Sequence, residues 1–320
     1  CCSYYAWRTL LTETPLARRL RSFRETLLKA NPAPRVTPRG PSRAIAADQI
    51  QDLLDTFRDF IGHRNMHYVA NNLLLPLTEA HRLSYAELVG PCQVQWFVSH
   101  CWNNAFADFV RALQKVAIGT HPREGVSFWI CTFSNNQYRI KEELGTYHKD
   151  SSFYLALHSG VCKGTAMIMD ERASLLNRSW CLFELLQTVT LEKTQENFAG
   201  LYFCTPTGVL NNGDATVELA MNIGKRIAGL SLQSATATSQ DDKDMINKLV
   251  LEEMGSFHRI DRILRNHLAE ALKKCQGMVD EQFDNLFTEL QGNAPENELE
   301  SIGESHGEGP VPDESVACLV

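Results

Sequence analysis

Between residues 94 and 230, short continuous apolar runs alternate with longer segments that have helical periodicity. The apolar runs are VQWFVS (94–99), VSFWICTF (126–133), GTAMIMD (164–170) and FAGLYFC (198–204). Strands that are apolar on both sides are typical of parallel sheets, because helices cover both faces of such sheets. The alternation predicts an α/β fold: a three-layer parallel sheet of about four to five strands, with flanking α-helices at both ends.

The chain on either side of this domain divides by composition. Residues 1–45 are predicted to form a basic amphipathic helix and a Pro/Arg-rich linker, and residues 46–92 a helical segment. The α/β domain takes residues 93–230, and residues 231–290 are predicted to form a helical extension. Residues 291–320 form an acidic tail, which we expect to be disordered because it is rich in Gly, Pro and Glu.

The charge distribution and the cysteines limit which classes of partner and which cellular compartment we expect. Residues 8–43 carry nine Lys or Arg against two Glu, whereas residues 276–320 carry eleven acids and no Lys or Arg. Such segregation is typical of solvated arms, so we expect no nucleic-acid partner. The ten cysteines contain no CxxC pair and no zinc-ligand spacing, which favours reduced thiols, no metal and a cytoplasmic location. No apolar run approaches the roughly 18 residues of a membrane span, so none is expected. The chain begins at Cys1 instead of Met, which leaves open whether it is a fragment.

Polar and aromatic side chains follow three of the predicted strands. In an open α/β sheet, ligands bind in the crevice outside the carboxyl ends of the strands. This rule selects a set of candidate binding residues: Ser99, His100, Trp102, Phe133, Asn135 and Asp170. Each has a structural alternative, since a strand-end histidine, a turn-forming asparagine, a capping aspartate or a core aromatic residue needs no ligand.

Glu184 is the single carboxylate in the segment NRSWCLFELL, residues 177–186. At about 100° per residue, Leu182 and Leu185 lie on the predicted core face of a helix. Glu184 lies on the opposite side, together with Trp180, Gln187 and Thr188. Two interpretations stay open: a solvated helix carboxylate, or an acid beside Trp180 in a cleft, because an exposed surface seldom carries a tryptophan. Motifs of other enzymes, GxGxxG, GxxxxGK[ST], GxSxG and HExxH, are absent from the sequence.

Three segments resemble TIR domains, members of a flavodoxin-like superfamily. WFVSHCW resembles their first-strand motif, and FYLALHSGVCKGTAMIMD resembles a later helix and strand. SWCLFELL is similar to the plant-type S-x-WCL-x-EL segment, with matches at Trp180, Cys181, Leu182 and Glu184. The resemblance covers roughly residues 94–230. The sequence departs from the family after the first-strand serine, where a basic residue is usual and His100 stands here.

The resemblance implies a TIR-like signalling domain that could be an NAD⁺ nucleosidase, with Glu184 as the catalytic acid. NAD would then be a substrate, and no cofactor is expected. One fixed carboxylate is enough for this chemistry, because the leaving nicotinamide is neutral and the sugar becomes an oxocarbenium-like cation. Many TIR domains instead act by assembly without turnover, so self-association or binding to other TIR-like domains is the alternative. A nucleoside deoxyribosyltransferase-like enzyme is a further alternative.

Overall fold

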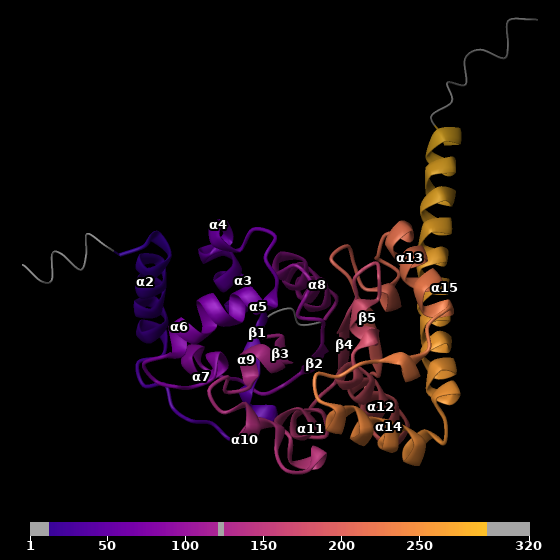
Figure 1. Ribbon diagram of the computed structural model, residues 1–320. Helices are drawn as coiled ribbons and strands as arrows, with labels where there is room; N and C mark the ends of the chain where they lie inside the picture. The colour runs from indigo at the N-terminus through magenta and orange to yellow at the C-terminus, as the bar shows by residue number, and fades with distance from the viewer. Residues whose placement is uncertain (1–12, 121–124, 293–320) are drawn as a thin grey trace, which may run out of the picture. The chain divides into compact units, whose positions relative to one another are not determined.

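The computed structural model describes residues 13–120 and 125–292 of the chain (Figure 1). The described residues up to 278 form one compact part, and the last turns of the final helix, from residue 279 to 292, form a second. Most of the acidic tail predicted for residues 291–320 lies outside the described residues, as does the start of the basic segment. Among the described helices, none combines the length and apolar character that a membrane crossing requires.

A five-stranded sheet lies at the centre of the first part, in the order β1-β3-β2-β4-β5. Strands β2 (Trp96–Ser99), β3 (Ser127–Ile130), β4 (Gly164–Ile168) and β5 (Leu201–Cys204) are parallel, each within a predicted apolar run. The α/β class with a mostly parallel sheet is therefore confirmed. The short edge strand β1 (Ile45–Ala46) is antiparallel to β3 and was not predicted, because two residues are too few to show a pattern.

Alternate strand residues belong to two separate apolar cores. Phe97 and Met167 point into one core, whereas Val98 and Ile168 point into the other. All four side chains are at most 3% exposed, as expected when helices cover both faces of a sheet.

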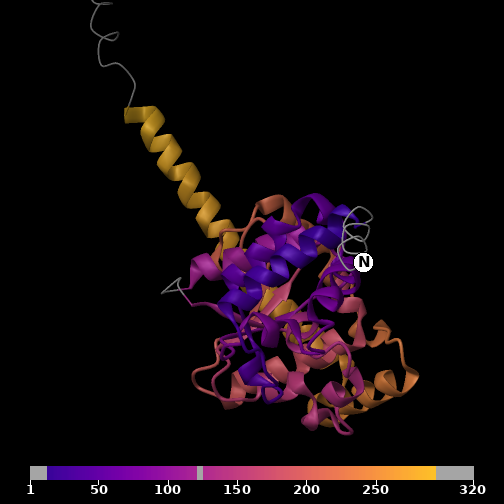
Figure 2. The ribbon, with the colours of Figure 1, turned by 90° about the vertical axis from the view of Figure 1, so that its left-hand side faces the viewer.

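The helices before β2, together with α8, pack against the face that includes Val98. In Figure 2 the indigo and purple N-terminal helices of this group face the viewer. These segments are α2 (Pro15–Ala30), α3 (Ala47–Thr56), α4 (Arg58–Ile61), α5 (Met66–Val69), η2 (Ala70–Leu74), α6 (Leu75–Thr78), α7 (Tyr85–Val89) and α8 (Phe106–Gly119). The helical turn α9 (Cys131–Ser134), after β3, adds Phe133 to the same core, whereas η1 (Pro41–Arg43) contacts α11 (Ser152–Leu157). Residues 46–92 thus share a core with the sheet.

The later helices pack against the face that includes Phe97. Helix α12 contacts α14 along much of its length, and the two run side by side in Figure 1. The segments after β3 that do not belong to the sheet are α10 (Ile140–Leu144), η3 (His148–Asp150), α11 (Ser152–Leu157), η4 (Ser174–Asn177), α12 (Ser179–Thr194), η5 (Leu210–Asn212), α13 (Val217–Ala228), η6 (Leu232–Ser234), α14 (Gln240–Met254) and α15 (Phe257–Gly292).

The segment predicted as a Pro/Arg-rich linker is tied to the body by a buried arginine. Arg43 is 5% exposed, and its guanidinium pairs with Glu143 at 2.7 Å and with Glu87 at 3.3 Å. It also donates to the backbone carbonyl of Thr37 at 2.6 and 2.8 Å. Composition predicted a linker without this anchor, because it shows a charge without showing the carboxylates that pair with it.

Candidate functional site

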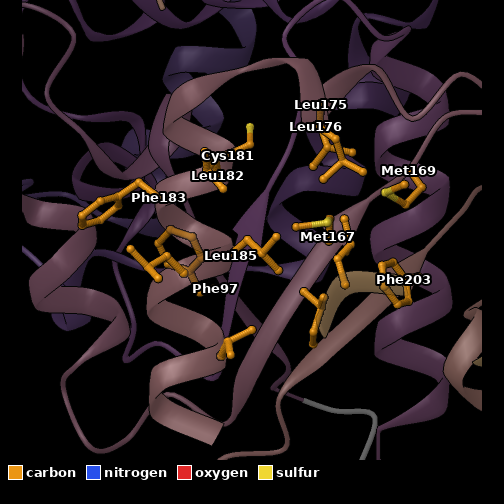
Figure 3. Close-up of a cluster of buried hydrophobic side chains, with 14 of the residues drawn as sticks. Phe97, Met167, Met169, Leu175, Leu176, Cys181, Leu182, Phe183, Leu185 and Phe203 are labelled. Atoms are coloured by element: carbon orange, nitrogen blue, oxygen red, sulfur yellow. The ribbon is translucent and has the colours of Figure 1, made fainter. Parts of the chain in front are cut away.

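Helix α12 carries the SWCLFELL segment and is enclosed on several sides. Figure 3 shows Cys181, Leu182 and Leu185 of α12 beside Phe97 and Met167 of the strands. On another side, the buried Gln187 donates to Glu253 of α14 at 3.3 Å. The predicted division into a core face and a solvated face is therefore wrong for this helix, because α14 covers the side that periodicity assigned to water.

Glu184 points toward the sheet. The Ser99 hydroxyl, at the end of β2, donates to Glu184 Oε2 at 2.5 Å. One turn further along the helix, the Thr188 hydroxyl lies 2.7 Å from that of Thr165 in β4. Glu184 and Thr188 thus form a short polar stripe of α12 that meets polar residues of two neighbouring strands, and the partly buried Glu184 favours the interpretation as an acid in a cleft.

Glu184 borders a cavity of about 310 Å³. The cavity lies beyond the carboxyl ends of β2 and β3 and beside the start of α12, where the crevice rule places ligands. The lining combines one carboxylate and one guanidinium with aromatic, aliphatic, thiol and amide groups: His100, Trp102, Cys131, Asn135, Gln137, Ile140, Leu144, Phe153, Arg178, Trp180, Cys181 and Glu184.

The enclosure changes the acidity of several groups in this cavity. Burial raises the pKa of Glu184 to about 7, although the Ser99 hydrogen bond and the Arg178 charge act in the opposite direction. Burial and the Arg178 charge lower the pKa of His100 to about 3, so this imidazole is neutral at pH 7. Burial raises the pKa of Cys131 to about 11 and that of Cys181 well above its usual value. The two thiols are therefore protonated at pH 7 and poor nucleophiles, whereas Glu184 titrates near neutrality.

Two tryptophans form aromatic walls of the cavity. The Trp180 indole N–H donates to Asp242 of α14 at 3.1 Å, and its ring packs edge-to-face on Phe153 with centroids 5.1 Å apart. Trp102 packs against the His67 ring at 5.1 Å. Because contacts outside the cavity fix both indoles, their orientation does not depend on a ligand.

A loop after β3 supplies the amide side of the cavity. The Gln137 side chain donates to the backbone carbonyls of Cys131, Thr132 and Asn135 at 3.0–3.2 Å, which closes this turn. The Ser152 hydroxyl lies 2.7 Å from Asn135 Oδ1. The Asn136 N–H donates to Glu143, the partner of Arg43. The segment that contains Arg43 therefore supports this wall of the cavity through Glu143.

The structure gathers six of the eight predicted site residues here. His100, Trp102, Asn135, Trp180 and Glu184 line the cavity, and Ser99 holds the Glu184 carboxyl. Phe133 does not reach it: the side chain is fully buried in the opposite core, beside Tyr85 at 5.7 Å. Phe133 lies within the helical turn α9, where the sequence predicted the end of a strand, and this turn directs its side chain away from the strand ends.

Asp170 belongs to a different cavity. Its carboxylate accepts from the backbone N–H of Ser174 at 2.7 Å and from the Ser174 hydroxyl at 2.6 Å, as an aspartate that stabilises a turn does. The surrounding cavity, about 500 Å³, follows strands β2, β4 and β5 and is lined by Asn103, Asn104, Ala105, Asp108, Phe109, Ile168, Met169, Asp170, Glu171, Arg172, Ser174, Pro206 and Leu219. We call it the Asp170 cavity and the first one the Glu184 cavity.

Arg178 is the most important lining residue that the sequence analysis missed. It directly precedes α12 and is the only Lys or Arg between residues 173 and 192. An isolated cation next to the strongest motif was an available signal. No sequence signal pointed to Cys131, Gln137 or Phe153, because only the packing of α9, α10 and α11 brings these residues to the cavity.

Within the described residues, no three His, Cys, Asp or Glu side chains gather as a metal site would need. Comparison with known proteins adds no name: no protein-family model, curated protein or solved structure matches the chain. The functional argument therefore depends on the residues of the Glu184 cavity.

Proposed function

We propose that this protein is a TIR-like NAD⁺ nucleosidase, which hydrolyses the nicotinamide–ribose bond with Glu184 as the catalytic carboxylate. The strand order supports the finer fold assignment, a three-layer flavodoxin-like domain. Counted alone, the four parallel strands run β3-β2-β4-β5, which is the order 2-1-3-4 of such folds.

A single observation carries the proposal. The Glu184 carboxyl is held by Ser99 in a cavity with two tryptophans, one phenylalanine and no second carboxylate. A surface glutamate would have neither the fixed hydrogen bond nor the enclosure. An acid–base pair of the usual glycosidase kind would need a second acid, whereas loss of neutral nicotinamide does not.

The reaction follows from these groups. The bond between ribose C1′ and the nicotinamide nitrogen breaks, and its electron pair neutralises the pyridinium ring. The Glu184 carboxylate stabilises the positive charge that develops on the ribose. Water then attacks C1′ and loses a proton to solvent, so the products are nicotinamide and ADP-ribose. The aromatic walls exclude bulk water, which strengthens the attraction between carboxylate and sugar cation.

The acidity of Glu184 suits this role. With a pKa of about 7 in the free protein, the carboxyl is about half ionised at neutral pH. A bound pyridinium cation favours the charged form and lowers that pKa, so binding itself produces the carboxylate. Neutral His100 adds no positive charge that would repel the substrate cation.

The test compares nicotinamide release from NAD⁺ by the wild-type protein with that by Glu184→Gln and Glu196→Gln. Glu196 is an exposed glutamate outside the cavity and serves as the matched control. We expect release by the wild type and the control and almost none by Glu184→Gln. Equal release by Glu184→Gln, with its melting temperature unchanged, would refute the assignment.

The same assay addresses the alternatives. Transfer of the ribosyl or deoxyribosyl group to an added base, in place of water, would indicate a deoxyribosyltransferase-like enzyme. An absence of turnover by the wild type, combined with concentration-dependent self-association, would favour the assembly module. Both alternatives stay predictions, as does the cytoplasmic location.

A further inference from the structure

Arg178 occupies a fixed position at the edge of the Glu184 cavity. It pairs with Thr236 in an isolated bridge. Ser179 N–H donates to the Thr236 carbonyl at 2.9 Å, and Thr236 N–H donates to the Asn177 carbonyl at 2.8 Å. The backbone on both sides of Arg178 is thereby anchored, while its half-buried side chain lines the cavity.

The Arg178 guanidinium has no acceptor of its own. Among the described residues, none forms a hydrogen bond or ion pair with it, although Glu184 lines the same cavity. Arg43 offers a contrast within the chain, since two carboxylates and a carbonyl meet its guanidinium. A guanidinium presents five N–H donors in a fork that matches the oxygens of phosphate or carboxylate groups, so Arg178 is available to an anionic ligand.

The start of helix α12 adds partial positive charge at the same place. The helix has no side-chain cap, and its backbone N–H groups at Trp180 and Cys181 have no acceptor among the described residues. Unpaired N–H groups and the helix dipole both favour an anion beside the first turn. Because Trp180 and Cys181 also line the cavity, the first turn and Arg178 face the same space.

The separation of the two charged residues along α12 indicates which kind of ligand could contact both. Arg178 precedes Glu184 by six residues, or roughly 9 Å along a helix axis at about 1.5 Å per residue. In the described part of the chain the side chains of Arg178 and Glu184 form no ion pair, whereas those of Arg43 and Glu143 do, at 2.7 Å. A group placed between them would present a cationic or hydroxyl-bearing side to Glu184 and an anionic side to Arg178. A ribose 5-phosphate has this polarity.

On the basis of the proposed function, we propose that Arg178 binds the 5′-phosphate of the ribose whose anomeric carbon faces Glu184. The cavity then selects phosphorylated N-ribosides, such as nicotinamide mononucleotide or the corresponding half of NAD, over unphosphorylated nucleosides. Arg178 is a binding and specificity residue in this assignment, and Glu184 remains the catalytic group.

The first experiment measures binding without turnover. Calorimetry compares ribose 5-phosphate with ribose on the wild-type protein, Arg178→Gln, Arg178→Lys and Arg172→Gln. Arg172 is exposed and lines the Asp170 cavity, so its variant is the matched control for loss of one positive charge. We expect at least tenfold weaker binding of ribose 5-phosphate to Arg178→Gln, an intermediate loss for Arg178→Lys, and less than a twofold change for Arg172→Gln.

Two results would overturn the assignment: unchanged affinity of Arg178→Gln for ribose 5-phosphate, or wild-type protein that binds the phosphate no more tightly than ribose. Arg178→Lys keeps a cation and protects the test against a fold defect in the glutamine variant. Because no bond is broken, this experiment decides the phosphate site even if the wild type fails to cleave NAD⁺.

The second experiment separates binding from chemistry. With nicotinamide mononucleotide, Arg178→Gln is expected to raise KM at least tenfold and change kcat less than threefold. With nicotinamide riboside, which lacks the phosphate, the same substitution should leave kcat/KM within about twofold of the wild type. A similar loss on both substrates would contradict phosphate recognition, since a general disturbance of the cavity does not distinguish them.

Discussion

The Glu184 cavity and the Asp170 cavity both lie beyond the carboxyl ends of the parallel strands, yet their carboxylates have different surroundings. Glu184 has one donor, Ser99, and an aromatic and thiol environment. Asp170 is held by the backbone and side chain of Ser174 and shares its cavity with Asp108, Glu171 and Arg172. Position at the strand ends is common to both. Enclosure by apolar groups is what makes one carboxylate titrate near neutrality, because burial penalises its charged form.

The largest expected effect tests whether only one cavity is catalytic. We expect Glu184→Gln to lower kcat for nicotinamide release by about 10³-fold, the scale for loss of one transition-state electrostatic group. Asp170→Asn should stay within about threefold, because its carboxylate only stabilises the turn before η4. A hundredfold loss in Asp170→Asn at an unchanged melting temperature would break the comparison and place both cavities in one site.

The second prediction concerns stability. Burial raises the pKa of Glu184 from 4.5 to about 7, so the native state keeps a proton that the unfolded chain has already lost. The free energy of unfolding should therefore fall as pH rises from about 4.5 to 7, by about 3 kcal/mol at most. Urea unfolding at pH 5 and pH 8 measures this fall.

Two variants test whether the Glu184 cavity causes this fall in the free energy of unfolding. Glu184→Gln should abolish it and be more stable than the wild type at pH 8, whereas Asp170→Asn should retain it. Identical pH dependence in the wild type and Glu184→Gln would mean that the Glu184 carboxyl is solvated in the native state.

The smallest expected effect is a change in how kcat/KM depends on pH. If the carboxylate is the active form, kcat/KM should rise about tenfold per pH unit below 7 and level off above it. Ser99→Ala should move the inflection to higher pH, because the Ser99 hydrogen bond favours the ionised form. Asp170→Asn should leave the profile unchanged. A rate that falls through pH 7 would show that protonated Glu184 acts as a general acid.

Much of the sheet could be predicted from the sequence because each parallel strand is buried on both faces and forms an apolar run. Strand β1 could not, since its two residues pair with β3 only through the tertiary fold. The burial of Arg43 had no local signal either, because Glu87 and Glu143 lie 44 and 100 residues further along the chain. Contacts between residues this far apart in the chain produce no periodic pattern in the sequence.

Part of the candidate site could likewise be predicted from the sequence, and part of it could not. The strand-end rule identified Ser99, His100, Trp102 and Asn135, but it also selected Phe133 and Asp170. Glu184 and Trp180 came from the helical segment that resembles TIR domains. A rule about position along a strand cannot tell which way a side chain turns after the strand ends. The helical turn α9 directs Phe133 into the other core, and the bonds to Ser174 hold Asp170 in a turn.

By itself, the sequence determined the α/β class, the positions of the four parallel strands and the one carboxylate worth testing, because these depend on local hydrophobic patterns and residue chemistry. The tertiary structure alone decided the environment of that carboxylate. Helix α14 covers the side of α12 that periodicity assigned to solvent, and Ser99 comes from 85 residues away. Arg178 lines the cavity and has no hydrogen-bond or ion-pair partner among the residues that the structure describes. Acidity depends on what surrounds a group in space, and the surroundings of Glu184 are assembled from strands and helices far apart in the chain.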